Sequence, residues 1–240
     1  MLILVSPTKT QKENPSGQCA DSLFPTIKTS IITKLQQYSQ QDIKNKMKVS
    51  DKIAEYVYNN YQNFNETTPA LLSYQGSSFK NMNIDQWSKR DFQEANERLY
   101  ILSALYGLSR CHSAVGQYRL DFLMKVDLDL YRIWKDPITN YLNELKQPIL
   151  NLASSEYSAM IDIKKLTVPM ITIDFKEQIG DNYKTKSTYA KIARGKMVSI
   201  LIQKQIRSFD EIKKICFDQY EFNSDLSDET TFVFSRKESL

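Results

Sequence analysis

A basic segment in the last third of the chain has the charge pattern best suited to binding an anion. Ser187 is expected to cap a helix over 188–206, and no acid lies between positions 184 and 196. The basic residues of this segment are Lys184, Lys186, Lys191, Arg194 and Lys196. Lys196 falls on the predicted apolar face, so its ammonium must extend along its own stem or into a cleft. Such a group could hold phosphates for affinity and positioning; the alternative is a solvated basic face.

A second candidate for phosphate binding is the turn at Gly107. Apolar residues at 99, 101, 102, 105 and 108 predict a buried helix that ends near Tyr106, with Gly107 as its left-handed C-terminal cap. Arg110 and Arg119 follow the turn. This arrangement suggests a helix-hairpin-helix-like element whose turn amides meet a phosphate. The simpler interpretation is a core helix with an ordinary glycine cap.

Polar residues follow two predicted buried strands, over 1–6 and 149–153. Ser6 to Thr10 come after the first strand, and Ser154 to Tyr157 come after the second. Open α/β sheets place ligands beyond the carboxyl ends of their strands, so these segments could form a pocket for a nucleobase or small molecule. Lys9 and Asp174 are then the candidate catalytic residues. Exposed loops are the alternative, and neither segment has the glycines of a nucleotide-binding loop.

The chain offers few groups for other kinds of catalysis or for metal binding. His112 is the only histidine and the three cysteines are far apart, so no metal site or cofactor is predicted. Iron could be held only by carboxylates, which we do not expect. Glu156, Asp174 and Glu177 are too scattered to suggest a paired general acid and base. We therefore consider a binding protein a better prediction than an enzyme.

Composition indicates a protein of the cytoplasm. The first ten residues lack the basic start and length of a signal peptide, and no apolar run approaches the roughly 20 residues of a membrane span. An odd number of cysteines without a CxxC pair fits a reducing compartment. We expect no membrane partner and no obligate protein partner. The net charge of +4 is mild, so an anion site depends on where the charges lie.

The periodicity predicts one α+β domain over 1–240, with a central mixed sheet surrounded by helices. Further helices are expected over 26–38 and 40–48, from Ser50, and from Pro137 as a first helical residue. Further strands are expected over 170–175, 183–186, 220–222 and 230–234. Residues 120–126 are ambiguous, with a strand slightly preferred.

Several sequence blocks resemble the YaaA family of peroxide-stress proteins. The blocks are MLILVSPTKT at the start, SDKIAE at 50–55, LSALYGLSR and QYRLDF within 102–122, IWKDPITNYLNE at 133–144, NLASSEY at 151–157 and YAKIARG at 189–195. The resemblance implies a mixed α+β fold with a positively charged cleft and a helix-hairpin-helix element. It also implies binding to duplex or branched DNA, and limitation of free iron during peroxide stress so that DNA suffers less oxidative damage.

Short motifs in each third of this sequence match the corresponding motifs of the family that it resembles. The matching residues are Ser6, Pro7 and Lys9, then Leu105, Tyr106, Gly107 and Arg110, then Tyr118 and Arg119, then 151–154, then Tyr189, Ala190, Lys191, Ala193, Arg194 and Gly195. Two positions depart from the family: Cys111 replaces a proline, and Phe175 replaces a glutamate. We predict that one DNA-binding cleft is lined by Lys9, Gly107, Arg110, Arg119, Lys191, Arg194 and Lys196.

Overall fold

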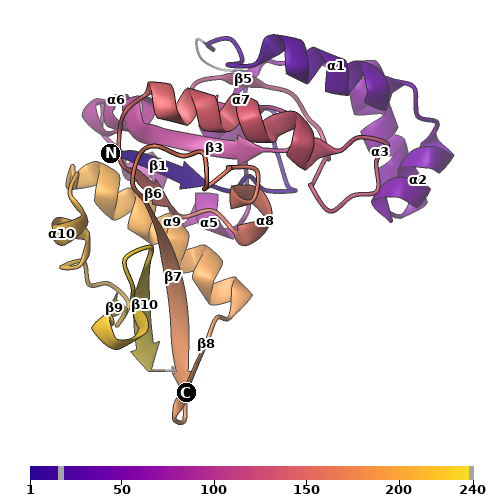
Figure 1. Cartoon of the computed structure of the whole chain (residues 1–240). Coiled ribbons are helices and arrows are strands. Elements are labelled where there is room, and N and C mark those ends of the chain that lie inside the picture. The colour runs from indigo at the N-terminus through magenta and orange to yellow at the C-terminus, as the bar shows by residue number, and fades with distance from the viewer. Residues whose placement is uncertain (16–18, 238–240) are drawn as a thin grey trace.

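The computed structural model describes residues 1–15 and 19–237 and has a mixed sheet at its centre (Figure 1). Within those residues the sheet has eight strands, and seven follow the spatial order β4-β3-β1-β6-β7-β10-β9, with β8 paired to β7. The bounds are β1 (Leu2–Val5), β3 (Leu99–Ser103), β4 (Gly107–Arg110), β6 (Ile149–Asn151), β7 (Met170–Ile179), β8 (Asn182–Lys184), β9 (Glu221–Phe222) and β10 (Thr231–Lys237). A separate small sheet pairs β2 (Thr68–Pro69) with β5 (Ala114–Val115).

The inner strands run parallel and the added strands run antiparallel. β1 pairs in parallel with β3 and with β6, β6 pairs in parallel with β7, and β7 pairs in parallel with β10. β4, β8 and β9 each join as antiparallel partners. The expected mixed sheet is therefore confirmed, as are the predicted strands at 1–6, 149–153 and 170–175.

Helices cover the sheet and extend beyond it (Figure 1). Their bounds are α1 (Pro25–Gln36), α2 (Gln40–Met47), α3 (Asp51–Gln62), α4 (Ala70–Ser73), α5 (Ser77–Lys80), α6 (Lys89–Arg98), α7 (Leu130–Glu144), α8 (Ser155–Ser158), α9 (Ser187–Gln203) and α10 (Phe209–Ile212), with short 3-10 turns at Ile84–Gln86 and Ser224–Leu226. α9 packs against α5, α6 and β7. None of the helices in the described ranges combines the length and apolarity that a bilayer crossing requires.

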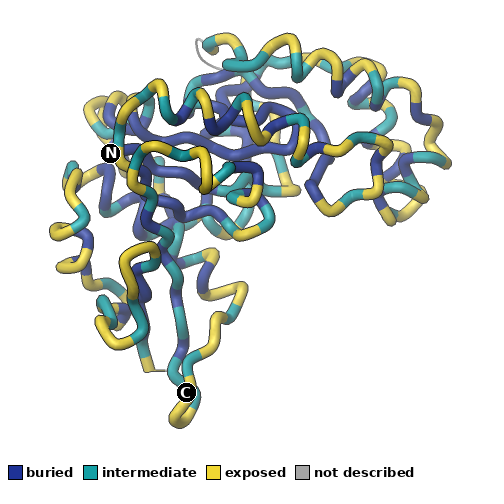
Figure 2. Tube along the Cα trace, viewed as in Figure 1, coloured by how far each residue is buried: buried dark blue, intermediate teal, exposed yellow. Residues whose placement is uncertain are grey.

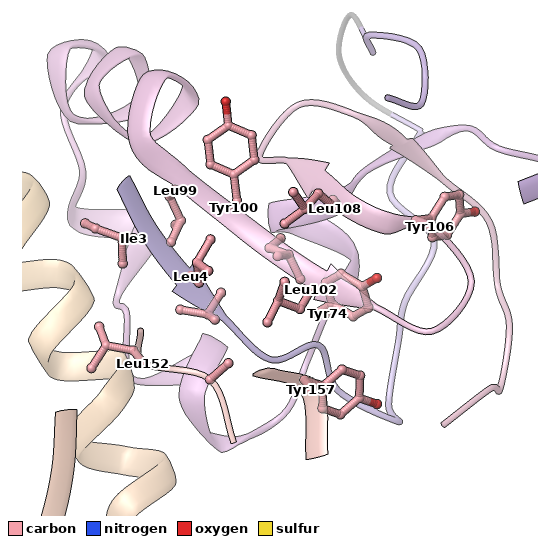
Figure 3. Packing of buried hydrophobic residues seen from close by; sticks show 14 of the residues in the cluster. Ile3, Leu4, Tyr74, Leu99, Tyr100, Leu102, Tyr106, Leu108, Leu152 and Tyr157 are labelled. Atoms are coloured by element: carbon pink, nitrogen blue, oxygen red, sulfur yellow. The ribbon is translucent and has the colours of Figure 1, made fainter. Parts of the chain in front are cut away.

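The core includes β1 and β3 along their whole lengths. All four residues of β1 are buried, as are all five of β3, because neighbouring strands and helices cover both faces (Figure 2). Figure 3 shows Ile3 and Leu4 of β1 gathered with Leu99 and Leu102 of β3. Strands buried on both faces carry continuous apolar runs rather than alternating ones.

The helix predicted to run to Tyr106 is wrong, and this burial explains why. α6 ends at Arg98, and the chain then forms a β3–β4 hairpin in which Gly107, the first residue of β4, has φ +70°. A short apolar run has the same composition in a buried helix and in a central strand. Residues 95–122 therefore do not form the expected helix-hairpin-helix-like element; the left-handed conformation of Gly107 serves a β-hairpin.

Two other local predictions are also wrong. Pro137 lies inside α7 rather than at its start, because the Asp129 side chain caps the helix at the Arg132 amide, 3.1 Å away. Trp134 and Ile138 are fully buried on either side of the proline, so packing outweighs the hydrogen bond that the proline removes. The second is the strand favoured over 120–126, which instead forms turns and bends.

Candidate functional site at the carboxyl ends of β1 and β6

The order of the strands creates a crevice between β1 and β6. From β1 the chain continues to β3 on one side, whereas from β6 it continues to β7 on the other. Connections that leave two adjacent parallel strands in opposite directions open a crevice at their carboxyl ends, where such sheets bind ligands. The polar segments that follow β1 and β6 meet there: the Ser154 amide donates to the Ser6 hydroxyl at 2.8 Å, and the two hydroxyls lie 3.2 Å apart.

A cavity of about 350 Å³ opens at this point, and we call it the strand-end cavity. Its volume lies within the range of small-molecule sites. It is lined by Val5, Ser6, Pro7, Thr8, Lys9, Thr10, Gly76, Ser77, Ser78, Met82, Asp121, Leu152, Ser154, Glu156, Tyr157, Lys191 and Arg194. The predicted convergence of the two strand ends is therefore present in the fold.

One wall of the cavity is the N-terminal half of α9, which reaches it by packing closely on α5. A Cβ added at Gly195 would lie 2.0 Å from the carbonyl oxygen of Ser78, so only glycine permits this approach. The Ser78 hydroxyl donates to the Lys191 carbonyl at 2.8 Å, which joins the two helices one turn earlier. This packing brings Lys191 and Arg194 to the cavity.

Arg194 is the least compensated charge of the cavity. Within the described residues its guanidinium has no hydrogen-bond or ion-pair partner, and its Nε is buried. Burial lowers the pKa of Arg194, and the negative charge of Asp174 opposes this effect only in part. Arg194 as a whole is half-buried. Its buried Nε has lost its hydration without regaining a partner from the protein, so an anionic ligand would supply the missing contact.

Two carboxylates lie on another part of the lining. Asp121 forms an ion pair with Lys9 at 2.9 Å and accepts a hydrogen bond from the Tyr157 hydroxyl at 3.0 Å. Glu156 has a buried Oε1 with no partner among the described residues. Burial raises the pKa of Glu156 and the charge of Asp121 adds to this, whereas Lys9 and the backbone amides of Leu123 and Phe122 oppose it. The cavity thus has one carboxylate that is well compensated and one whose pKa is raised.

A second depression of about 280 Å³ adjoins the strand-end cavity, and we call it the basic groove. Lys9, Asp121 and Glu156 line both spaces. The remaining lining residues of the basic groove are Lys46, Met47, Lys48, Arg119, Leu123, Met124 and Lys125. Lys46 is paired with Asp127 at 2.8 Å. Lys48 and Lys125 are exposed and form no ion pair with the described part of the chain.

Four of the seven residues predicted for a DNA cleft come together in these two spaces. Lys9, Lys191 and Arg194 line the cavity, and Arg119 lines the groove. The sequence favours a solvated face for the basic run of Lys44, Lys46, Lys48 and Lys52, and a lone aspartate such as Asp121 carries no spacing signal. Only the approach of loop 120–129 to α2 and β1 makes them neighbours.

The other predicted residues lie elsewhere. Gly107 packs on Trp134, and Arg110 on β4 donates to the Tyr141 hydroxyl of α7 at 3.3 Å. Lys196 pairs with Asp218 at 2.5 Å, because α9 buries a different face from the one predicted: Met197, Val198 and Leu201 are inside, whereas Tyr189 is exposed. The catalytic candidate Asp174 accepts from the Thr185 hydroxyl at 3.2 Å and does not line the cavity.

Comparison with known proteins confirms the family resemblance that the sequence blocks indicate. A family profile described as peroxide stress protein YaaA matches residues 1–226. A UPF0246 protein of Fusobacterium nucleatum is 38% identical over the full length of both chains. UPF0246 proteins of Francisella philomiragia and Francisella tularensis are 34% identical, over 98% of this chain and 100% of theirs.

These matches define a family of proteins that align with nearly the whole of this chain. The chain belongs to the peroxide stress protein YaaA family, which includes the UPF0246 proteins.

Proposed function

We propose that this protein binds duplex or branched DNA in the cytoplasm during peroxide stress, protects it from oxidation and helps to limit free iron. The observation that carries the DNA-binding part is the continuity of positive charge from the basic groove into the strand-end cavity. Lys48, Lys125 and Arg119 line the groove, and Lys191 and Arg194 continue the series in the cavity. Family membership supports the link to peroxide stress.

The proposed contacts are electrostatic and independent of base sequence. Cations without protein partners release counterions from DNA when they contact phosphates. The acids Asp121 and Glu156 lie where the groove meets the cavity, and Lys9 neutralises the first of them. A DNA backbone could therefore cross the junction near Lys9, which offsets the negative charge there. On either side of the junction it would contact the unpaired cations of the groove and of the cavity.

The test is fluorescence anisotropy of a labelled duplex and a four-way junction at several salt concentrations. The variant carries Lys48→Gln, Lys125→Gln and Lys191→Gln. Each lost phosphate contact should reduce the slope of log affinity against log salt by about 0.9. We expect a reduction of roughly 2 to 3 for the triple variant.

A matched control carries Lys196→Gln, Lys204→Gln and Lys214→Gln, which change the net charge equally but lie outside both spaces. We expect this control to retain most of the native slope. Equal losses in the two triple variants would mean that only net charge matters, and the basic groove would then not be the binding site.

The presence of both Asp121 and Glu156 in the lining of the cavity favours a second candidate, an enzyme that cleaves a nucleobase from its sugar. Glu156 would donate its proton to the leaving base while Asp121 accepts a proton from the attacking water, so that water replaces the base on the sugar. Chromatography of nucleosides and oligonucleotides after incubation would show the free base. Glu156→Gln and Lys9→Ala should abolish its release, whereas Asp174→Asn should retain it. The absence of any free base with the native protein would exclude this candidate.

A further inference from the structure

The strand-end cavity has two ends of opposite chemical character. Lys191 and Arg194 reach it from α9, whereas Asp121 and Glu156 reach it from the loop after β5 and from α8. The lining also includes buried apolar side chains, Met82 and Leu152 among them. A ligand that fills this space must carry an anionic group, an apolar or flat middle and hydrogen-bond donors.

We expect the anionic group of the ligand to contact Arg194. Its Nε is buried without a partner in the described residues, and no carboxylate within ion-pair distance neutralises the guanidinium. A planar guanidinium presents a fork of N–H donors that matches phosphate oxygens two at a time. Lys191 is exposed on the same wall and supplies a second positive charge. Two cations and several hydroxyls suit a phosphate better than a single carboxylate.

We expect the hydrogen-bond donors of the ligand to contact Glu156. Asp121 already accepts from Lys9 and Tyr157, whereas the Oε1 of Glu156 is buried with no donor in the described part of the chain. A buried acceptor without a partner costs free energy that a ligand N–H would restore. The exocyclic amine of cytosine is a group that carboxylates accept from in nucleic-acid recognition.

We propose that the strand-end cavity binds one nucleoside monophosphate unit, with its phosphate on Arg194 and Lys191 and an amino-bearing base against Glu156. The unit is either a free nucleotide or the 5′-phosphorylated terminal nucleotide of a strand in the basic groove. The second source rests on the DNA binding proposed above, whereas the first does not.

Calorimetric titration of the full chain with CMP, UMP, cytidine and inorganic phosphate tests the free source. CMP should bind at least about tenfold more tightly than each of the other three, because they lack the amine, the phosphate or the base. Arg194→Gln should weaken CMP binding at least about tenfold. Glu156→Gln should reduce the preference for CMP over UMP, because an amide N–H can donate to the uracil carbonyl.

Anisotropy with a duplex that ends in 5′-phosphocytidine, against the same duplex with a 5′-hydroxyl, tests the DNA source. The phosphorylated end should bind more tightly, and Arg194→Gln should remove the difference while Lys196→Gln leaves it. If Arg194→Gln lowers the melting temperature severely, Arg194→Lys is used in its place. Lysine keeps the positive charge but lacks the two-pronged guanidinium, so this variant should still bind CMP more weakly than the native protein.

The outcomes separate the two proposals. CMP binding with the expected variant effects supports the cavity assignment even if the duplex is not bound. A second outcome is that CMP does not bind, while the duplex binds through Lys48 and Lys125 with the same affinity whether or not its end is phosphorylated. That outcome overturns the cavity assignment and leaves the DNA proposal in place. Equal binding of CMP, UMP and inorganic phosphate also overturns it, because the site would then be only an anion site.

Discussion

The environment of Glu156 should make folding stability depend on pH. Its folded pKa is raised by burial and by the charge of Asp121. The unfolded chain therefore releases this proton at lower pH than the folded chain does. The contribution of Glu156 to folding stability is therefore greatest at pH values below about 4.5, its pKa in the unfolded chain. This contribution is lost as the pH rises through the higher pKa that Glu156 has in the folded chain.

At neutral pH, Glu156→Gln should therefore stabilise the protein, since it removes a charge that folding disfavours. We expect the melting temperature to rise by about 2 °C at pH 7 and to change little at pH 4. Differential scanning fluorimetry over this pH range measures both values. Glu55→Gln, at an exposed position of α3, is the control and should show no such pH dependence. A loss of stability at pH 7 would mean that the ionised Glu156 is favoured by its surroundings.

At the scale of elements, the contact between α9 and α5 decides whether the cavity has a cationic wall. Gly195→Ala would place its Cβ against the backbone carbonyl of Ser78, so the two helices would have to move apart. We expect the free energy of unfolding to fall by roughly 1 to 3 kcal/mol, measured by urea denaturation. Ligand or DNA binding that uses Lys191 should weaken with it, because the helices must separate.

Lys196→Ala, one residue further on α9, is the control for this change. It removes a partly exposed ion pair with Asp218, which is worth about 1 kcal/mol or less. Equal destabilisation by the two substitutions would show that α9 tolerates displacement from α5.

At the scale of the whole molecule, β7 joins two parts of the sheet. Its first residues pair with β6, whereas residues from 172 onward pair with β10 and, near its end, with β8 (Figure 1). A polar cluster holds the second part: Arg236 on β10 donates to Glu177 on β7 at 2.9 Å, and the Tyr220 hydroxyl also donates to Glu177. Glu177 is only 1% exposed, so these partners replace the contacts that water would make with its carboxylate.

Arg236→Met should therefore leave a buried carboxylate without its cation and destabilise the protein by roughly 3 kcal/mol. Hydrogen exchange should show β10 and the end of β7 losing protection before β1 and β3. The neighbouring Lys237→Met is the control, since Lys237 is exposed and should cost little. Uniform loss of protection over the whole sheet would show that both parts unfold as one cooperative unit.

Much of the architecture could be predicted where local signals agreed with the tertiary environment. The strand at β1, the β7–β8 hairpin and α9 follow from apolar runs, turn residues and helical periodicity. The prediction failed at Leu99–Ser103, since an apolar run buried on every side carries no period that separates strand from helix. It failed at Pro137 because packing around Trp134 outweighed a lost hydrogen bond.

By itself, the sequence determined the mixed α+β class, the polar segments after β1 and β6, and the basic character of α9, because composition and short-range pattern carry this information. Only the tertiary structure decided which charges meet. Arg194 faces a cavity and Lys196 faces Asp218, although both belong to the same basic helix. Asp121 pairs with Lys9, which lies more than a hundred residues earlier in the chain, and it influences Glu156, which lies some thirty residues later. No local sequence pattern encodes contacts over such separations.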